Sequence, residues 1–93
     1  MTREEKDFMI LGISSFGVKH QEDFDINIGG VSVSIFWHYP SINVGWYPIA
    51  QIDRFIDGNW ETVFRGEGAE NPELWQGFAN DLCLIIRETI REE

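Results

Sequence analysis

Two runs of alternating apolar and polar residues form the clearest pattern along the chain. Residues 24–28 read FDINI, residues 31–35 read VSVSI, and Gly29-Gly30 separates them. Alternation at period two indicates a strand with one buried face, and a Gly-Gly pair suits the two positive-φ positions of a tight hairpin turn. The expected hairpin brings six apolar side chains to one face: Ile28 opposite Val31, Ile26 opposite Val33, and Phe24 opposite Ile35.

Two further strands are expected after this hairpin. The second strand is expected to end at the turn signal Pro40-Ser41. A third strand is expected over residues 42–55, with a bulge or an irregular edge where Gly45 and Pro48 interrupt it. Asp57-Gly58 predicts a second two-residue hairpin turn, from which a fourth strand returns.

The N-terminal residues fit the start of a helix. Thr2 and Glu5 have the spacing of a capping box, in which each side chain bonds the backbone of the other residue. A short helix is therefore expected to end near Gly12. A strand over residues 8–13 is the alternative.

The last part of the chain predicts a longer helix. Asn71-Pro72 is a favourable pair for an N-cap and a first helical position, and Glu73 suits the positive end of the helix dipole. Apolar residues then recur at steps of three and four from Trp75 to Ile90. This spacing is typical of an amphipathic helix with one buried side.

The predicted elements follow the order α-β-β-β-β-α, which places the chain in the α+β class. We expect a four-stranded antiparallel meander with the helices packed on one face, in a single domain over residues 1–93. The other face of the sheet is then open to solvent. The expected core contains Ile26, Val31, Val33, Ile35, Trp60, Phe78, Leu82 and Ile86.

Charge makes this an acidic domain. The chain has 16 acidic and 7 basic residues, a formal net charge of −9, and 14% aromatic residues. Few Lys and Arg residues disfavour direct binding to nucleic acid or to an anionic membrane, whereas the negative charge favours a basic protein partner. Cys83 is the one cysteine, and no apolar run is long enough to span a bilayer. We therefore expect a cytoplasmic protein without an intrachain disulfide.

The candidate partner-binding residues are acidic and aromatic. No Lys or Arg occurs between His20 and Asp53 or between Gly66 and Ile86, so these two stretches are purely negative. The alternative for the acids is that they only keep the protein in solution, and the alternative for Phe36 is burial under the N-terminal segment. The predicted partner-binding residues are Glu22, Asp23, Asp25, Phe36, His38, Trp46, Tyr47, Glu67, Glu70 and Glu73.

The sequence predicts no catalytic, metal or cofactor site. The two histidines have no Cys partner and match no zinc spacing, and the serine pairs lack the context of a nucleophile elbow. Cys83 falls on the apolar side of the last predicted helix, where a small core residue is expected. We therefore expect a protein that is not an enzyme.

The leading functional hypothesis is a small acidic binding protein that inhibits a basic, nucleic-acid-handling protein. Phage anti-defence proteins and nuclease-immunity proteins act in this way as a class, with carboxylates in place of phosphates as acceptors for the partner's arginines. One alternative is a structural or regulatory interaction module, or a homodimer, whose acidity serves only solubility. Another is a small acidic secretion chaperone.

Overall fold

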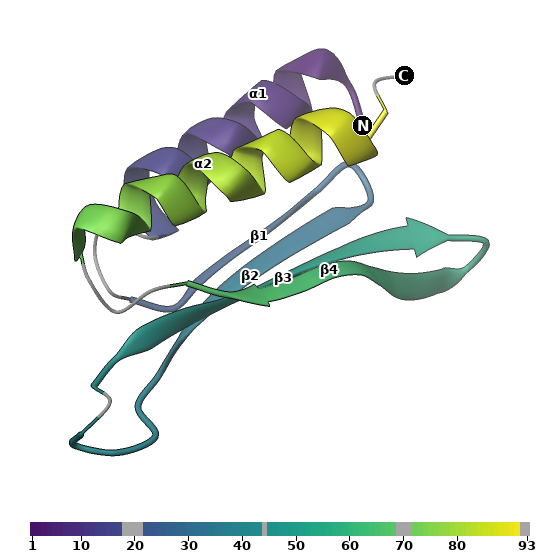
Figure 1. Cartoon of the computed structure of the whole chain (residues 1–93). Helices are drawn as coiled ribbons and strands as arrows, with labels where there is room; N and C mark the ends of the chain where they lie inside the picture. The colour runs from purple at the N-terminus through teal and green to yellow at the C-terminus, as the bar shows by residue number, and fades with distance from the viewer. Residues whose placement is uncertain (18–21, 44, 69–71, 92–93) are drawn as a thin grey trace.

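Two helices flank four strands along the chain (Figure 1), which confirms the predicted α+β order. The computed structural model describes residues 1–17, 22–43, 45–68 and 72–91, without the side chains of residues 16, 17 and 72–75. The elements are α1 (Arg3–Gly12), the π-helix η1 (Ile13–Gly17), β1 (Phe24–Ile28), β2 (Val31–His38), β3 (Tyr47–Ile56), β4 (Asn59–Glu67) and α2 (Pro72–Thr89).

The strands form one antiparallel meander in the order β1-β2-β3-β4. The first hairpin has the predicted register, with Ile28 opposite Val31, Ile26 opposite Val33 and Phe24 opposite Ile35. Its turn residues Gly29 and Gly30 have φ angles of 60° and 76°. The second predicted turn is also confirmed, because Asp57 and Gly58 have φ angles of 51° and 83° between β3 and β4.

The third strand begins later than predicted. β3 starts at Tyr47, whereas the sequence pattern placed its start near Ile42. Gly45 has a φ of 78°, and its N–H donates to the Ser41 carbonyl at 3.0 Å. Such a turn cannot continue a strand. Pro48, expected at an irregularity, lies within β3 opposite Trp37.

The bulge of the sheet lies in β4 and explains why the prediction of a buried Trp60 was wrong. Ile52 pairs with Phe64 and Asp53 pairs with Thr62, so Val63 is an extra residue in β4. A bulge shifts the alternation of side chains by one position. Trp60 is therefore on the face opposite to Phe64, and 49% of its surface is exposed.

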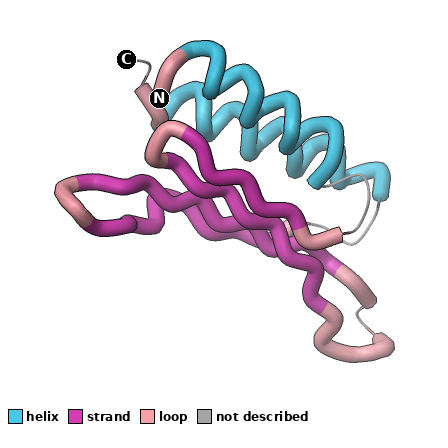
Figure 2. The backbone as a smooth tube through the Cα atoms, turned by 180° about the vertical axis from the view of Figure 1, so that it is seen from behind, coloured by secondary structure: helices cyan, strands magenta, loops and turns pink. Residues whose placement is uncertain are grey.

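Both helices cover the same face of the sheet (Figures 1 and 2). Five predicted core residues are buried there, whereas Ile26 and Phe78 are half-buried and pack against the core. The five are Val31, Val33, Ile35, Leu82 and Ile86. Side chains from α1 and η1, including Met9 and Ile13, complete the core. No helix in the described ranges is long and apolar enough to cross a membrane.

The N-terminal helix forms with the predicted capping box. The Thr2 N–H donates to Glu5 Oε1 at 2.8 Å, and the Glu5 N–H donates to Thr2 Oγ1 at 3.2 Å. At Gly12, an added Cβ would lie 3.3 Å from the Phe24 ring, so the small residue allows α1 to approach β1 closely. The alternative of a strand over residues 8–13 is excluded.

Side-chain contacts join α1 and η1 to α2. Lys6 is buried, and its Nζ donates to the carbonyls of Arg87 (3.0 Å) and Ile90 (2.5 Å). Cys83 is buried as predicted, with its Sγ 3.3 Å from Ser14 Oγ. The charged group of Lys6 thus bonds carbonyl groups at the C-terminal end of α2, where positive charge is favourable.

Candidate protein-binding face of the sheet

The face of the sheet that points away from the helices carries the candidate site, and we call it the open face. Its side chains lie in rows across the strands because the register places alternate residues opposite each other. Two central rows are polar, namely Asp25–Ser34–Gln51–Arg65 and Asn27–Ser32–Asp53–Thr62. A third row is Phe36–Ile49–Glu67.

Hydrogen bonds connect the polar rows across the strands. Gln51 Nε2 donates to both carboxylate oxygens of Asp53 at 3.1 Å, and Thr62 Oγ1 donates to Asp53 Oδ1 at 2.7 Å. Arg65 Nη1 donates to Gln51 Oε1. Asp53 is therefore held in one orientation, and a group fixed in this way loses little entropy if it binds a ligand.

The Asp25 carboxylate occupies the edge of the polar region. It is exposed on β1 and accepts a hydrogen bond from Ser34 Oγ at 3.2 Å. With Asp53 and Glu67, it gives the open face three carboxylates, against one guanidinium from Arg65. The sheet is four strands wide, so Asp25 and Glu67 lie on opposite edges, roughly 14 Å apart across the strands.

Aromatic rings lie at the β3–β4 turn end of the open face. Phe55 faces Trp60 across the two strands, with ring centroids 5.4 Å apart, and about half of each side chain is exposed. Large exposed rings of this kind are typical of interface cores, because they bury much apolar area with little loss of side-chain freedom.

A second group of rings lies at the other end, where the segment between β2 and β3 projects beyond the helices (Figures 1 and 2). His38 contacts Tyr47 edge-on at 5.3 Å, and Tyr39 contacts Trp46 at 4.9 Å. Phe36 is half-buried on the open face, with the guanidinium of Arg65 5.9 Å from its ring centroid. Burial of Phe36 under the N-terminal segment is excluded, since α1 lies on the opposite face.

The predicted acidic residues are only partly brought together. Asp25 and Glu67 are both on the open face. Glu22 and Asp23 precede β1 and bond Trp37, because the Glu22 carbonyl accepts from Trp37 Nε1 and Asp23 Oδ1 accepts from the Trp37 N–H, each at 3.1 Å. Glu70 lies outside the described residues, and Glu73 belongs to α2 with its side chain outside them.

Sequence reasoning missed two contributors to this face, Asp53 and the Phe55–Trp60 pair. A usable signal was present for the pair. A two-residue turn at Asp57-Gly58 requires Phe55 to face Trp60. Phe55 and Asp53 are two residues apart on β3, so their side chains lie on the same face of the sheet. Alternation counted back from Phe64 gives the wrong face for Trp60, because that count crosses the bulge.

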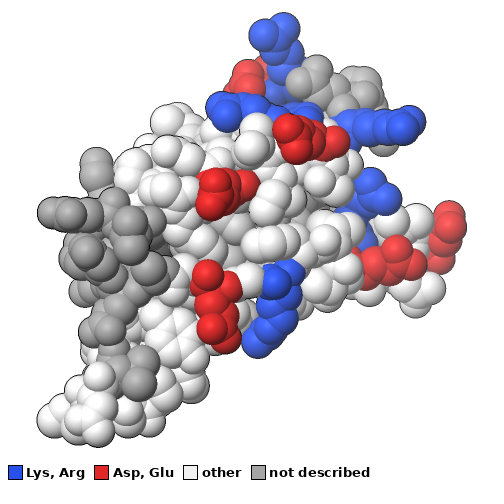
Figure 3. Space-filling view, viewed as in Figure 1, with Lys and Arg blue, Asp and Glu red and all other residues white. Residues whose placement is uncertain are grey.

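Basic residues gather away from the open face, at the end of the molecule where both termini lie (Figure 3). Lys6 bonds the end of α2, and Arg54 and Arg91 line one hollow with Met1. Arg65 is the basic residue that the described strands place on the open face. Acidic residues such as Glu4 and Glu5 also lie at that end, so the basic groups are mixed with acids there, whereas the open face has a negative balance.

The described residues contain no group of three or more His, Cys, Asp or Glu that could hold a metal ion. No family model matches the chain, and neither a curated protein nor a solved structure is significantly similar to it. The open face therefore carries the indications of function.

Proposed function

We propose that the protein is a small acidic, non-enzymatic binding protein that docks its open face on a basic, nucleic-acid-handling protein and inhibits it. The observation that carries this proposal is the arrangement of Asp25, Asp53 and Glu67 on one face of the sheet, between exposed aromatic groups. Carboxylates accept hydrogen bonds from Lys and Arg in the same way as phosphates, so such a face competes with nucleic acid for a basic groove.

The two kinds of side chain on this face have complementary roles in binding. Exposed Phe55 and Trp60 supply apolar area, which gives most of the affinity of an interface. The carboxylates select a basic partner and speed the encounter. Asp53 gains most from its fixed orientation, because Gln51 and Thr62 already hold its oxygens.

A second candidate function is a homodimer or interaction module in which acidity serves only solubility. The exposed Phe55–Trp60 pair favours it, because an apolar patch of this kind can meet a second copy of itself. The net charge of −9 on each chain opposes such association at low salt. Salt dependence therefore separates the two functions.

The proposal is tested by reversing one charge on the open face and one elsewhere. Asp25→Lys changes the open face, and Asp7→Lys makes the same change of charge at an exposed position on α1. Asp23 is unsuitable for this test, because its carboxylate bonds the Trp37 backbone and its loss would disturb the sheet. Each protein serves as bait in cell extract, and the retained protein is identified and titrated.

We expect the wild-type and Asp7→Lys proteins to retain the same basic partner and to block its action on nucleic acid. Asp25→Lys should bind that partner about tenfold more weakly or worse, because one attraction becomes a repulsion. Equal affinity of the two variants would show that the charge of the open face has no part in binding, and the proposal would be wrong.

A further inference from the structure

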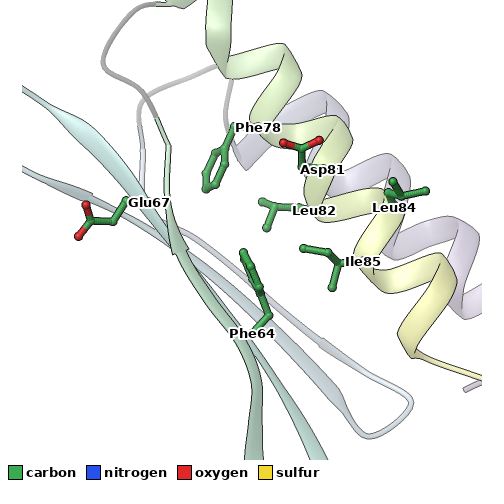
Figure 4. A pocket seen from close by; sticks show the side chains of 7 residues that line it. All are labelled: Phe64, Glu67, Phe78, Asp81, Leu82, Leu84 and Ile85. Carbon is green, nitrogen blue, oxygen red and sulfur yellow. The ribbon is translucent and has the colours of Figure 1, made fainter.

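A second surface lies on the helix side of the sheet, between α2 and the edge strand β4. It is an apolar groove of about 390 Å³. Figure 4 shows Phe64, Phe78, Leu82 and Ile85 pointing into the space, with Leu84 and Asp81 on α2 beside it. Leu84 is 51% exposed, so apolar surface remains uncovered here.

Two glycines allow rings to form the floor of this groove. At Gly66 an added Cβ would lie 2.6 Å from the Phe64 ring, and at Gly68 it would lie 2.7 Å from the Phe78 ring. The rings therefore occupy the space over the strand that side chains at residues 66 and 68 would otherwise fill. This leaves an apolar floor alongside the backbone of β4.

Among the strands that the structure describes, none pairs with the outer side of β4 beside the groove. β4 is at the edge of the sheet, and the Gly68 N–H donates to the Pro48 carbonyl of β3 at 2.8 Å. Backbone groups of alternate residues point to opposite sides of an antiparallel strand. Gly66 and Phe64 therefore turn toward β3, whereas Arg65 and Glu67 turn their N–H and C=O groups toward the free edge.

We propose that this groove and edge form a docking site for an extended segment of a basic partner protein, which adds a fifth strand beside β4. The alternate side chains of an added strand would enter the groove, where apolar residues fit against Phe64 and Ile85. This inference deepens the proposed function and rests on it for the basic character of the partner.

The side chains of the added strand that do not enter the groove would be selected by the charge of the residues beside the site. Glu67 points away from the groove, and Asp81 stands beside it on α2 (Figure 4). Arg65 does not oppose a basic segment, since its guanidinium bonds Gln51 and lies 5.9 Å from the Phe36 ring, toward the middle of the sheet. Lys or Arg at the alternate positions would therefore point to the same face as Glu67, and Asp81 adds negative charge on the groove side, whereas a second copy of this chain would add its own acids.

The test uses a synthetic peptide of alternating Val and Lys, nine residues long to match β4. A Val-Asp alternating peptide tests the charge, and a peptide with the same Val and Lys residues in two blocks tests the alternation. Binding is followed by titration, and hydrogen exchange reports each backbone amide. We expect only the Val-Lys alternating peptide to bind, and to slow exchange at the Arg65 and Glu67 amides by about tenfold or more.

Matched leucine variants distinguish the groove from the rest of the surface. Leu84→Lys places a charge at the rim of the groove, and Leu11→Lys makes the same change on α1, where Leu11 is 63% exposed. We expect Leu84→Lys to weaken peptide binding by about tenfold or more and Leu11→Lys to leave it within about twofold. Both positions are exposed, so both variants should fold.

The inference is overturned if the Val-Lys alternating peptide does not bind. It is equally overturned if the block or Val-Asp peptide binds as well, or if Leu84→Lys binds like Leu11→Lys. Asp25 lies on the opposite edge strand, so its variant tests the open face alone. If the peptide does not bind the groove but the open face still docks on its partner, only this inference is rejected. If the peptide binds the groove but the Asp25 variant shows no loss of docking, only the proposed function is rejected.

Discussion

At the scale of single residues, positive φ angles fix the two tight turns of the sheet. Gly30 has a φ of 76°, and the nearest atom to an added Cβ there is Phe55 Cβ at 3.9 Å. A side chain at this position therefore has room and meets no clash. Any loss of stability on substitution comes from the backbone conformation, which β-branched residues resist.

We predict that Gly30→Val lowers the free energy of unfolding by about 1–3 kcal/mol. Gly77 provides the opposite control, because it lies in α2 and nothing is within 4 Å of an added Cβ. Gly77→Ala should raise stability by about 0.5–1 kcal/mol, since alanine favours the helix. Chemical denaturation of both variants checks the pair. An unchanged midpoint for Gly30→Val would contradict the turn conformation.

The capping box makes the stability of α1 depend on pH. The hydrogen bond from the Thr2 backbone, followed by that from its side chain, holds the pKa of Glu5 below its usual value of 4.5. A lowered pKa means that the folded state favours the ionised carboxylate. The stabilising effect of the Glu5 carboxylate is therefore complete above the unfolded-state pKa, and it is lost as the pH falls through the folded-state pKa.

We predict that Glu5→Gln destabilises the protein at neutral pH and that the difference from wild type shrinks as the pH falls below 4.5. Denaturation midpoints of both proteins across this range provide the measurement. A difference that stays constant with pH would show that the charge of Glu5 has no role in the cap.

At the scale of elements, one lysine joins the two helices. Lys6 on α1 donates to the carbonyl of Arg87 in the last turn of α2 and to that of Ile90 just after the helix, where carbonyls lack helical partners. Lys6→Met keeps much of the apolar side chain and removes the donors. We predict a loss of about 1–3 kcal/mol in the free energy of unfolding, because buried carbonyls are left without partners.

Arg3→Met on the same helix is the matched control for this prediction. Arg3 is exposed, so its replacement should change stability by less than about 0.5 kcal/mol. Thermal or chemical unfolding of both variants measures the difference. Equal stability of the two variants would mean that Lys6 does not hold the end of α2.

At the scale of the whole molecule, the proposed function makes binding to other proteins depend on charge. A net charge of −9 repels a second copy of the chain but attracts a basic partner, and salt screens both effects. We predict that partner binding weakens steeply as salt rises from about 0.05 to about 0.3 M, because the screening length falls in this range.

Sedimentation velocity of the protein alone, at the same salt concentrations, separates this behaviour from self-association. We expect a monomer at low salt, where repulsion is strongest. A dimer through Phe55 and Trp60 would instead strengthen as salt rises. Partner binding that does not change with salt would contradict the acidic docking mode.

Local interactions explain which features the sequence determined. The first hairpin, its register and the N-terminal cap depend on residues within a few positions of each other, so their patterns can be recognised in the sequence. The meander and the single helix-covered face follow from consecutive hairpins and amphipathic helices. Asp25 and Phe36 could be placed on the open face for the same reason.

Only the tertiary structure decided the features that depend on residues far apart in the chain. The extra residue Val63 in β4 carries no signal of its own, yet it moves Trp60 from the core face to the open face. Lys6 meets the end of α2 across more than eighty residues, and Asp25 shares a face with Glu67 only because three strand pairings lie between them. Packing between the elements selects these contacts, so the local pattern of residues does not show them.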